Sequence, residues 1–260
     1  MKNLIDTHSH IHFKKNFPDI DVVKTRALEA DVFKQILVGC NLLDSLNAKS
    51  FAESNESFWW TIGAHPHDTK DFSLEDMVKF EKILVEEKKN PQTKLRAIGE
   101  CGLDYFRNLS PIEIQKKIFI WQLQIAEKYD LPVVIHIRDA YNDAFDILKN
   151  IGYKKIILHC FSGGLNEAYL AWNAGYITSF SGVVTYPKND ELRQCAKEAP
   201  QDLIVVETDC PFLAPQKFRG QRNEPAFVAE TARVVAEERG MSLESFAELS
   251  TANAEKFFKI

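Results

Sequence analysis

The residues best suited to chemistry stand in the first apolar segment, LIDTHSHIHF at positions 4–13. It holds three of the chain's seven histidines, His8, His10 and His12. In an extended strand alternate side chains share a face, so His8 and His10 would project together with Asp6 behind them. Two neutral imidazoles side by side form part of a coordination shell for a divalent cation. A histidine-rich loop that hydrogen-bonds its own backbone is the alternative, and this segment alone leaves both open.

Short apolar, β-branched runs that alternate with helix-like segments indicate how the chain positions these side chains. Eight strands followed by helices predict an α/β protein with a parallel sheet closed into a single (β/α)8 TIM barrel, one domain over residues 1–260. The expected strands are residues 4–8, 34–39, 59–65, 95–100, 132–136, 154–159, 176–182 and 203–209.

Two helices have recognisable start signals. Ser73 is a plausible N-cap for a helix over LEDMVKFEKILVEEKK. The helix PIEIQKKIFIWQLQIAEKY opens with Pro111 behind Ser110. Both segments are therefore expected to separate consecutive strands.

The polar residues of interest fall at the ends of the expected strands. All seven histidines lie at or just past a strand's C-terminal end, where active sites are built in this barrel. An unpaired carboxylate in such a position is costly, whereas a dication neutralises it. Two ions sharing one carboxylate suit this set better than one crowded ion, and its imidazole and carboxylate donors fit Zn²⁺, Mn²⁺ or Mg²⁺. The candidate ligands are His8, His10, Glu100, His136, His159 and Asp209.

Seven motifs along the chain carry a resemblance to a known family: DTHSH, GAHPHD, GECGLDY, HIRDA, HCFSG, ETDCP and RNEPAFV. Together they resemble the TatD family of metal-dependent hydrolases, which belongs to the amidohydrolase-like barrels. The resemblance implies deoxyribonuclease activity. It also implies a first metal on His8, His10 and Asp209, and a second metal on His136 and His159 that Glu100 bridges to the first. His12 departs from the family pattern, which often has an acidic residue there.

Further roles follow for residues near these ligands. Asp209 and Glu100 are the expected catalytic carboxylates, and Asp209 could also accept a proton from the attacking water. His65 could contact a phosphate or a leaving oxygen, or it could support the metal ligands without contacting the substrate. For His67 a structural role is expected, and His12 is expected to be a loop histidine.

A basic loop is the expected substrate contact. The segment 210–222 holds three cations and no acid, in a region where barrels of this kind bind phosphate. A solvated loop is the alternative. Arg138 points to the same side as His136. The candidate substrate-binding residues are therefore Arg138, Lys217, Arg219 and Arg222.

Bulk composition limits the classes of function. The net charge of −5 argues against a broad nucleic-acid-binding surface without excluding a local basic cleft. The five cysteines are scattered and form no CxxC pair, which disfavours a disulfide framework. The absence of a long apolar run and of room for a signal peptide predicts a cytoplasmic protein without membrane association.

The leading hypothesis is a two-metal phosphodiesterase that removes nucleotides from single-stranded or end-frayed DNA, because a strand end can thread into the pit at the end of a barrel. One alternative keeps the metals but cleaves an ester or amide, as in a D-aminoacyl-tRNA deacylase. The other is a non-catalytic metal scaffold, which the mixed, cysteine-free ligand set disfavours. The physiological metal, the strand polarity and the oligomeric state stay open.

Overall fold

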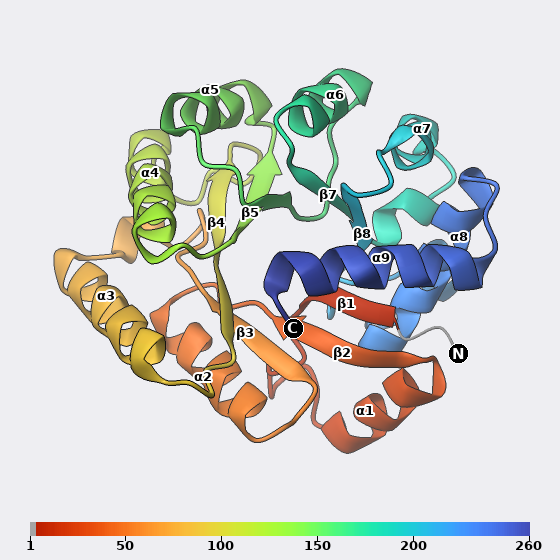
Figure 1. Cartoon of the computed structure of the whole chain (residues 1–260), viewed down its shortest axis with the longest axis horizontal. Helices are drawn as coiled ribbons and strands as arrows, with labels where there is room; N and C mark the ends of the chain where they lie inside the picture. Colours follow the sequence, from red (N-terminus) through yellow and green to blue (C-terminus); the bar gives the residue numbers. More distant parts are fainter. Residues whose placement is uncertain (1–3) are drawn as a thin grey trace. The chain divides into compact units, whose positions relative to one another are not determined.

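The computed structural model describes residues 4–260, and within them each of the eight expected strands is present (Figure 1). The strands alternate with helices and form a sheet in the order β1 to β8. This confirms the predicted (β/α)8 fold class. The strands are β1 (Leu4–Ser9), β2 (Val32–Leu37), β3 (Phe58–Ile62), β4 (Leu95–Asp104), β5 (Val133–Arg138), β6 (Ile156–Leu158), β7 (Ile177–Phe180) and β8 (Ile204–Val206).

Helices α1 to α7 connect consecutive strands, and α8 and α9 follow β8. They are α1 (Ile20–Glu29), α2 (Leu42–Glu53), α3 (Leu74–Lys89), α4 (Ile112–Tyr129), α5 (Tyr141–Ile151), α6 (Leu165–Asn173), α7 (Asp190–Glu198), α8 (Val228–Glu238) and α9 (Leu243–Phe258). Short 3-10 turns occur at Thr69–Asp71, Gly182–Thr185, Gln216–Phe218 and Pro225–Phe227. Among the described residues, no helix has the length and apolar character needed to cross a membrane.

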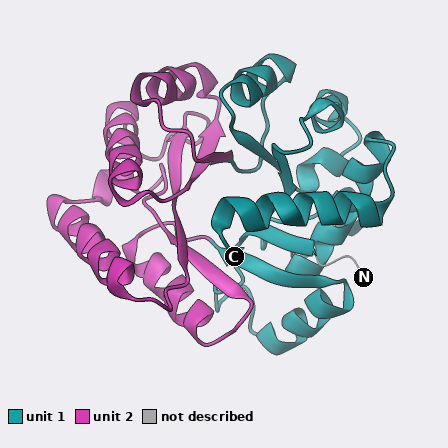
Figure 2. Ribbon diagram, in the orientation of Figure 1, with its two compact units in different colours: residues 1–37, 158–260 teal, residues 38–157 magenta. Residues whose placement is uncertain are grey.

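The chain divides into two compact units (Figure 2). Unit 1 combines the segment up to Leu37 with Leu158–Ile260, and unit 2 is the central segment Val38–Ile157. The expectation of a single domain over residues 1–260 stays a prediction. Each unit carries its own group of chemically relevant side chains.

Unit 1 is organised around β1, whose six residues are all buried. A strand that is covered on both faces usually consists of apolar residues. Asp6 and His8 are polar and buried in this strand, and they require partners because an unpaired buried polar group is costly. β1 pairs with β2 in parallel, and a bridge between Ser9 and Cys210 places the segment after β8 beside the end of β1.

Unit 2 contains the parallel strands β3, β4 and β5. The helix α3 begins where its sequence predicts, because Ser73 and Asp76 form a reciprocal capping box. The helix α4 begins at Ile112, one residue later than expected, with Pro111 as its N-cap. Trp60 and Phe119 are completely buried in this unit and belong to its packed core.

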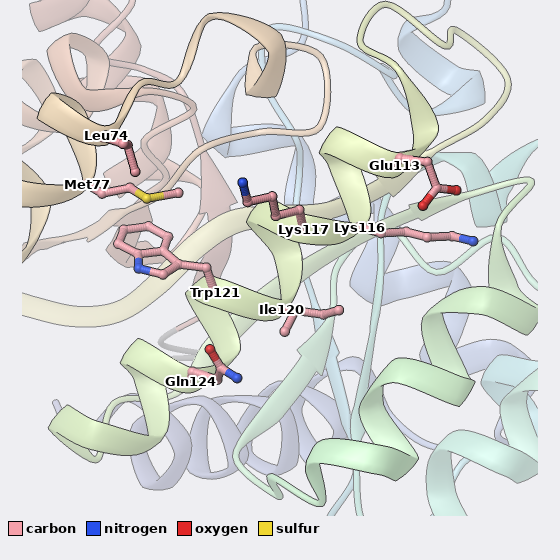
Figure 3. Close-up of a pocket in the computed structure, with 8 residues that line it drawn as sticks. All are labelled: Leu74, Met77, Glu113, Lys116, Lys117, Ile120, Trp121 and Gln124. Carbon is pink, nitrogen blue, oxygen red and sulfur yellow. The ribbon is translucent and has the colours of Figure 1, made fainter.

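A groove of about 550 Å³ runs between α3 and α4 of unit 2 (Figure 3). Leu74, Met77 and Trp121 give it an apolar side, whereas Glu113 and Lys116 give it charges of both signs. The residues that line it include none of the predicted site residues.

The strand ends differ from expectation in ways that affect the site. β3 and β8 end three residues before His65 and Asp209, which therefore lie on the following segments. The prediction that Glu100 closes its strand is wrong, since β4 continues to Asp104. The reason is the partner strand: β4 and β5 stay in register through Asp104 and Arg138.

Candidate metal centre

The first cluster lies in unit 1 and joins His8, His10 and Asp209. The Nε2 atoms of His8 and His10 are 3.2 Å apart. The Oδ1 atom of Asp209 lies 3.7 Å from the Nε2 of His8 and 3.5 Å from that of His10. Three donors from separate positions in the chain therefore face one another, and they form one of the groups whose atoms could hold a metal ion.

These separations fit the coordination shell of one ion. Two donors that each lie about 2.0–2.1 Å from a tetrahedral zinc ion are separated by about 3.3 Å. The three measured distances span 3.2–3.7 Å. Imidazole nitrogen and carboxylate oxygen are also donors that Zn²⁺ and Mn²⁺ accept. The geometry and the chemistry of this cluster both suit a divalent cation.

Backbone pairing between two distant segments assembles the cluster. His8 lies in β1, and its carbonyl oxygen accepts a hydrogen bond from the backbone N–H of Asp209 at 2.9 Å. The N–H of His10 donates to the carbonyl of Cys210 at the same distance. Asp209 has a φ of 58°, a left-handed conformation that aspartate tolerates better than most residues. The turn after β8 is thus held against the end of β1.

The electrostatics of Asp209 reflect its imidazole neighbours. Burial pushes the pKa of its carboxyl group up, but the hydrogen bond from His10 and the charges of His159, His8 and His10 outweigh burial and lower the pKa overall. Asp6, behind the histidines, accepts hydrogen bonds from the backbone and hydroxyl of Thr208 at 2.9 and 2.5 Å. Burial nevertheless raises the pKa of Asp6 to about 7.

His159 extends the cluster and has a carboxylate behind it. Its ring stacks on that of His8 with centroids 3.8 Å apart. Its Nδ1 atom lies 3.0 Å from Oε1 of Glu207, a fully buried residue. Because a carboxylate only accepts, Nδ1 carries the proton and Nε2 keeps the lone pair that a metal requires. Glu207 also accepts hydrogen bonds from the N–H of Cys160 at 2.7 Å and from Ser179 at 2.5 Å.

The second cluster lies in unit 2 and joins His65, Glu100 and His136. Oε1 of Glu100 lies 3.3 Å from Nε2 of His65 and 3.1 Å from Nδ1 of His136. The sequence placed Glu100 with His136, and the structure adds His65 as a third donor. Burial lowers the pKa of His65, and this effect outweighs the neighbouring Glu100 carboxylate, which acts in the opposite direction. A neutral imidazole is the form that binds a metal.

Asp104 supports this second cluster. Its Oδ2 atom lies 3.2 Å from Nε2 of His136 and 2.7 Å from Nε2 of His67. Binding a metal through Nδ1 of His136 requires the proton on Nε2, where Asp104 accepts it. Burial raises the pKa of Asp104, but the hydrogen bonds from His136, the N–H of Arg107 and His67 lower it overall, well below the ordinary range.

Sequence reasoning missed Asp104 and Glu207, although a signal existed for each. Both lie in quoted motifs, GECGLDY and ETDCP, and Glu207 stands two residues before Asp209. Buried carboxylates in strand-end motifs with histidine ligands are candidates to orient those ligands. The structure also gives His67 a partner in Asp104, and it places His12 in a buried turn after β1.

The four cations predicted to bind substrate have different partners in the structure. Arg222 donates to both carboxylate oxygens of Asp19, at 2.7 and 2.8 Å. Arg219 stacks over Tyr186 with its guanidinium carbon 4.3 Å from the ring centre. Lys217 is exposed, 4.0 Å from Glu230. In unit 2, Arg138 is exposed and lies 3.9 Å from the ring centre of Phe106.

The (β/α)8 fold and the clusters of histidine and carboxylate donors define the class of metal-dependent hydrolases. The comparisons with known proteins agree, since residues 5–259 match the model of the TatD-related DNase family. The chain therefore belongs to this family, as its motifs predicted.

Relatives support the same assignment. A Bacillus subtilis protein named an uncharacterized metal-dependent hydrolase, YabD, is 36% identical over 99% of both chains. A protein from Erwinia billingiae named 3′-5′ ssDNA/RNA exonuclease TatD is 33% identical, over 93% of this chain and 94% of its own. The crystal structure of a TatD homologue from Escherichia coli K12 superimposes with a TM-score of 0.92 at 28% identity and covers 100% of both chains.

Proposed function

We propose that this protein is a metal-dependent exonuclease that removes nucleotides from a free 3′ end of single-stranded DNA or RNA. The observation that carries the proposal is the spacing of His8, His10 and Asp209, whose donor atoms lie as they would around one divalent ion. Membership of a family that includes named single-strand exonucleases supports the substrate class.

We propose two divalent ions, Mg²⁺, Mn²⁺ or Zn²⁺. One is held by His8, His10 and Asp209 in unit 1, and the other by the Glu100 and His136 cluster of unit 2. When bound, such ions activate a water molecule and neutralise charge that develops on a phosphodiester. The family resemblance also implies that Glu100 would be a ligand of both ions and that His159 would be a ligand of the second ion. We keep both roles as part of this proposal.

Side chains of the protein carry out the other roles in the proposed reaction. Asp209 accepts the proton of the attacking water, because its carboxylate is ionised near neutral pH and can act as a general base. Glu207 and Asp104 hold the rings of His159 and His136 with one nitrogen protonated and the other unprotonated. His65 is the candidate contact for a phosphate or leaving oxygen.

A small number of cations binds the strand. Lys217, Arg219 and Arg138 are exposed and are the primary candidates for phosphate contacts. Arg222 would have to exchange Asp19 for a phosphate, so we assign it a secondary role. Two or three phosphate contacts correspond to a slope of about −1.4 to −2.1 in the logarithm of affinity against the logarithm of salt concentration.

The test uses matched linear and circular single-stranded DNA with the purified protein. We expect the linear strand to lose nucleotides from its 3′ end and the circle to resist. Chelation should abolish cleavage, and added Mg²⁺ or Mn²⁺ should restore it. Equal cutting of circle and line would refute the exonuclease. Cleavage of D-aminoacyl-tRNA, with both DNA forms and RNA left intact under every metal, would instead identify the deacylase.

A further inference from the structure

Phe212 presents an exposed aromatic ring from a backbone that is firmly anchored. The side chain follows β8 and is 52% exposed, although it is large and apolar. Its N–H donates to the carbonyl of Asp209 at 2.9 Å, and its own carbonyl accepts from Nδ2 of Asn223 at 2.5 Å. Asn223 is fully buried and also donates to the carbonyl of Thr208 at 2.8 Å. The backbone that carries this exposed ring is therefore fixed at both its N–H and its carbonyl group.

The ring lies next to the metal cluster of unit 1. Its centroid is 6.4 Å from that of His10, in an edge-on arrangement. Phe13 stacks on His10 with centroids 4.8 Å apart. In a nucleotide the base is separated from the phosphate by one sugar. A phosphodiester at His10 would thus bring the attached base within reach of Phe212.

Charge around Phe212 favours an anionic aromatic ligand. Its loop, residues 210–222, contains three cations and no acidic residue. Lys217 is exposed, and stacking on Tyr186 holds the Arg219 guanidinium. The hydroxyl of Tyr186 in turn donates to the carbonyl of Ala214 in the same loop, at 3.0 Å. An apolar platform beside fixed positive charge matches a base attached to phosphates.

We propose that Phe212 stacks on the base of the 3′-terminal nucleotide and thereby selects unpaired strand ends. This inference rests on the proposed exonuclease function and deepens it. Stacking uses the flat face that every base offers, so it tolerates sequence. A base inside a duplex is covered by its neighbours and fixed by its pair, so it must be freed before Phe212 can receive it.

The experiment is a double comparison of protein and substrate. Fluorescein-labelled oligothymidylate with either a normal or an abasic 3′-terminal residue is titrated with chelator-treated protein, and anisotropy gives Kd. The variants are Phe212→Ala, Phe212→Leu and Phe212→Trp, with Leu170→Ala on α6 as a control because Leu170 is similarly exposed, at 56%. Hydrolysis of both substrates with Mn²⁺ is measured in parallel.

For the wild type we expect the abasic end to bind about 5- to 150-fold more weakly, the range that corresponds to one stacked base. Phe212→Ala should lose the same factor with the normal end and nothing further with the abasic end. Phe212→Leu should behave like alanine, whereas Phe212→Trp and Leu170→Ala should resemble the wild type. Melting temperatures should stay unchanged because the ring is exposed.

Two results would overturn the inference while leaving the exonuclease intact. In one, Phe212→Ala binds and cuts the normal end as well as the wild type does. In the other, Phe212→Ala weakens both ends equally, which would show that the ring does not contact the base. Failure of the wild type to bind or cut any oligonucleotide, by contrast, would overturn the proposed function and this inference with it.

Discussion

Glu207 offers the sharpest test of how the protein prepares its metal ligands. This buried carboxylate accepts three hydrogen bonds, from His159, the N–H of Cys160 and the hydroxyl of Ser179. Glu207→Gln keeps the shape and one acceptor oxygen but removes the charge. Glu207→Ala removes every acceptor and leaves Nδ1 of His159 without the partner that fixes its proton.

The expected magnitudes follow from these contacts. A hydrogen bond to a charged group contributes about 1.5–3 kcal/mol and one between neutral groups about 0.5–1.5 kcal/mol. Glu207→Gln therefore weakens the hydrogen bond that orients His159 by about 1–1.5 kcal/mol, which corresponds to a loss of about 5- to 13-fold in metal affinity. Complete loss of such a supporting carboxylate typically costs about 10- to 100-fold, which is the expectation for Glu207→Ala.

Competition with a chromophoric chelator measures the affinity for Zn²⁺ or Mn²⁺, and melting of the chelator-treated protein separates metal binding from folding. Glu87→Gln is the matched control in unit 2, where the buried Glu87 pairs with Lys49 at 2.6 Å and Thr93 at 2.5 Å. It should lower the melting temperature without changing metal affinity. Wild-type affinity in a folded Glu207→Ala protein would refute the assignment.

Two further predictions concern other residues. Glu100→Gln removes the carboxylate of the unit 2 cluster. The metal content measured by mass spectrometry should therefore fall, and the affinity for the metal should weaken by at least about 100-fold. Unchanged metal content would contradict the ligand role of Glu100. The pair between Asp19 and Arg222 gives a pH test, because the hydrogen bond from Arg222 lowers the pKa of Asp19 from 3.8 to about 2. The stabilising effect of this pair is present above pH 3.8 and is lost as the pH falls through about 2. The urea midpoints of the wild type and of Arg222→Ala should therefore differ near neutral pH and converge at about pH 2. A difference that stays constant with pH would show that the pair is not its cause.

The sequence by itself determined the fold class and singled out His8, His10, Asp209, Glu100 and His136, whereas the structure added His65 to the second cluster. Apolar runs alternating with helical segments predicted eight strands, and each is present. The expected placement of His8, Glu100 and His136 towards the carboxyl ends of strands predicted metal donors, although β4 continues past Glu100 and β5 past His136. His8 and His10 meet since alternate residues of an extended segment share a face.

Only the tertiary structure decided which partners these groups have. Register between β4 and β5 extends β4 to Asp104, whose carboxylate then lies against His136. The turn after β8 sets Glu207 against His159, 48 residues earlier in the chain. Arg222 donates a hydrogen bond to Asp19 across 203 residues, a partner that no local pattern indicates. Hydrogen-bond and ion-pair partners depend on the register and packing of distant segments, and these are properties that local sequence patterns do not contain.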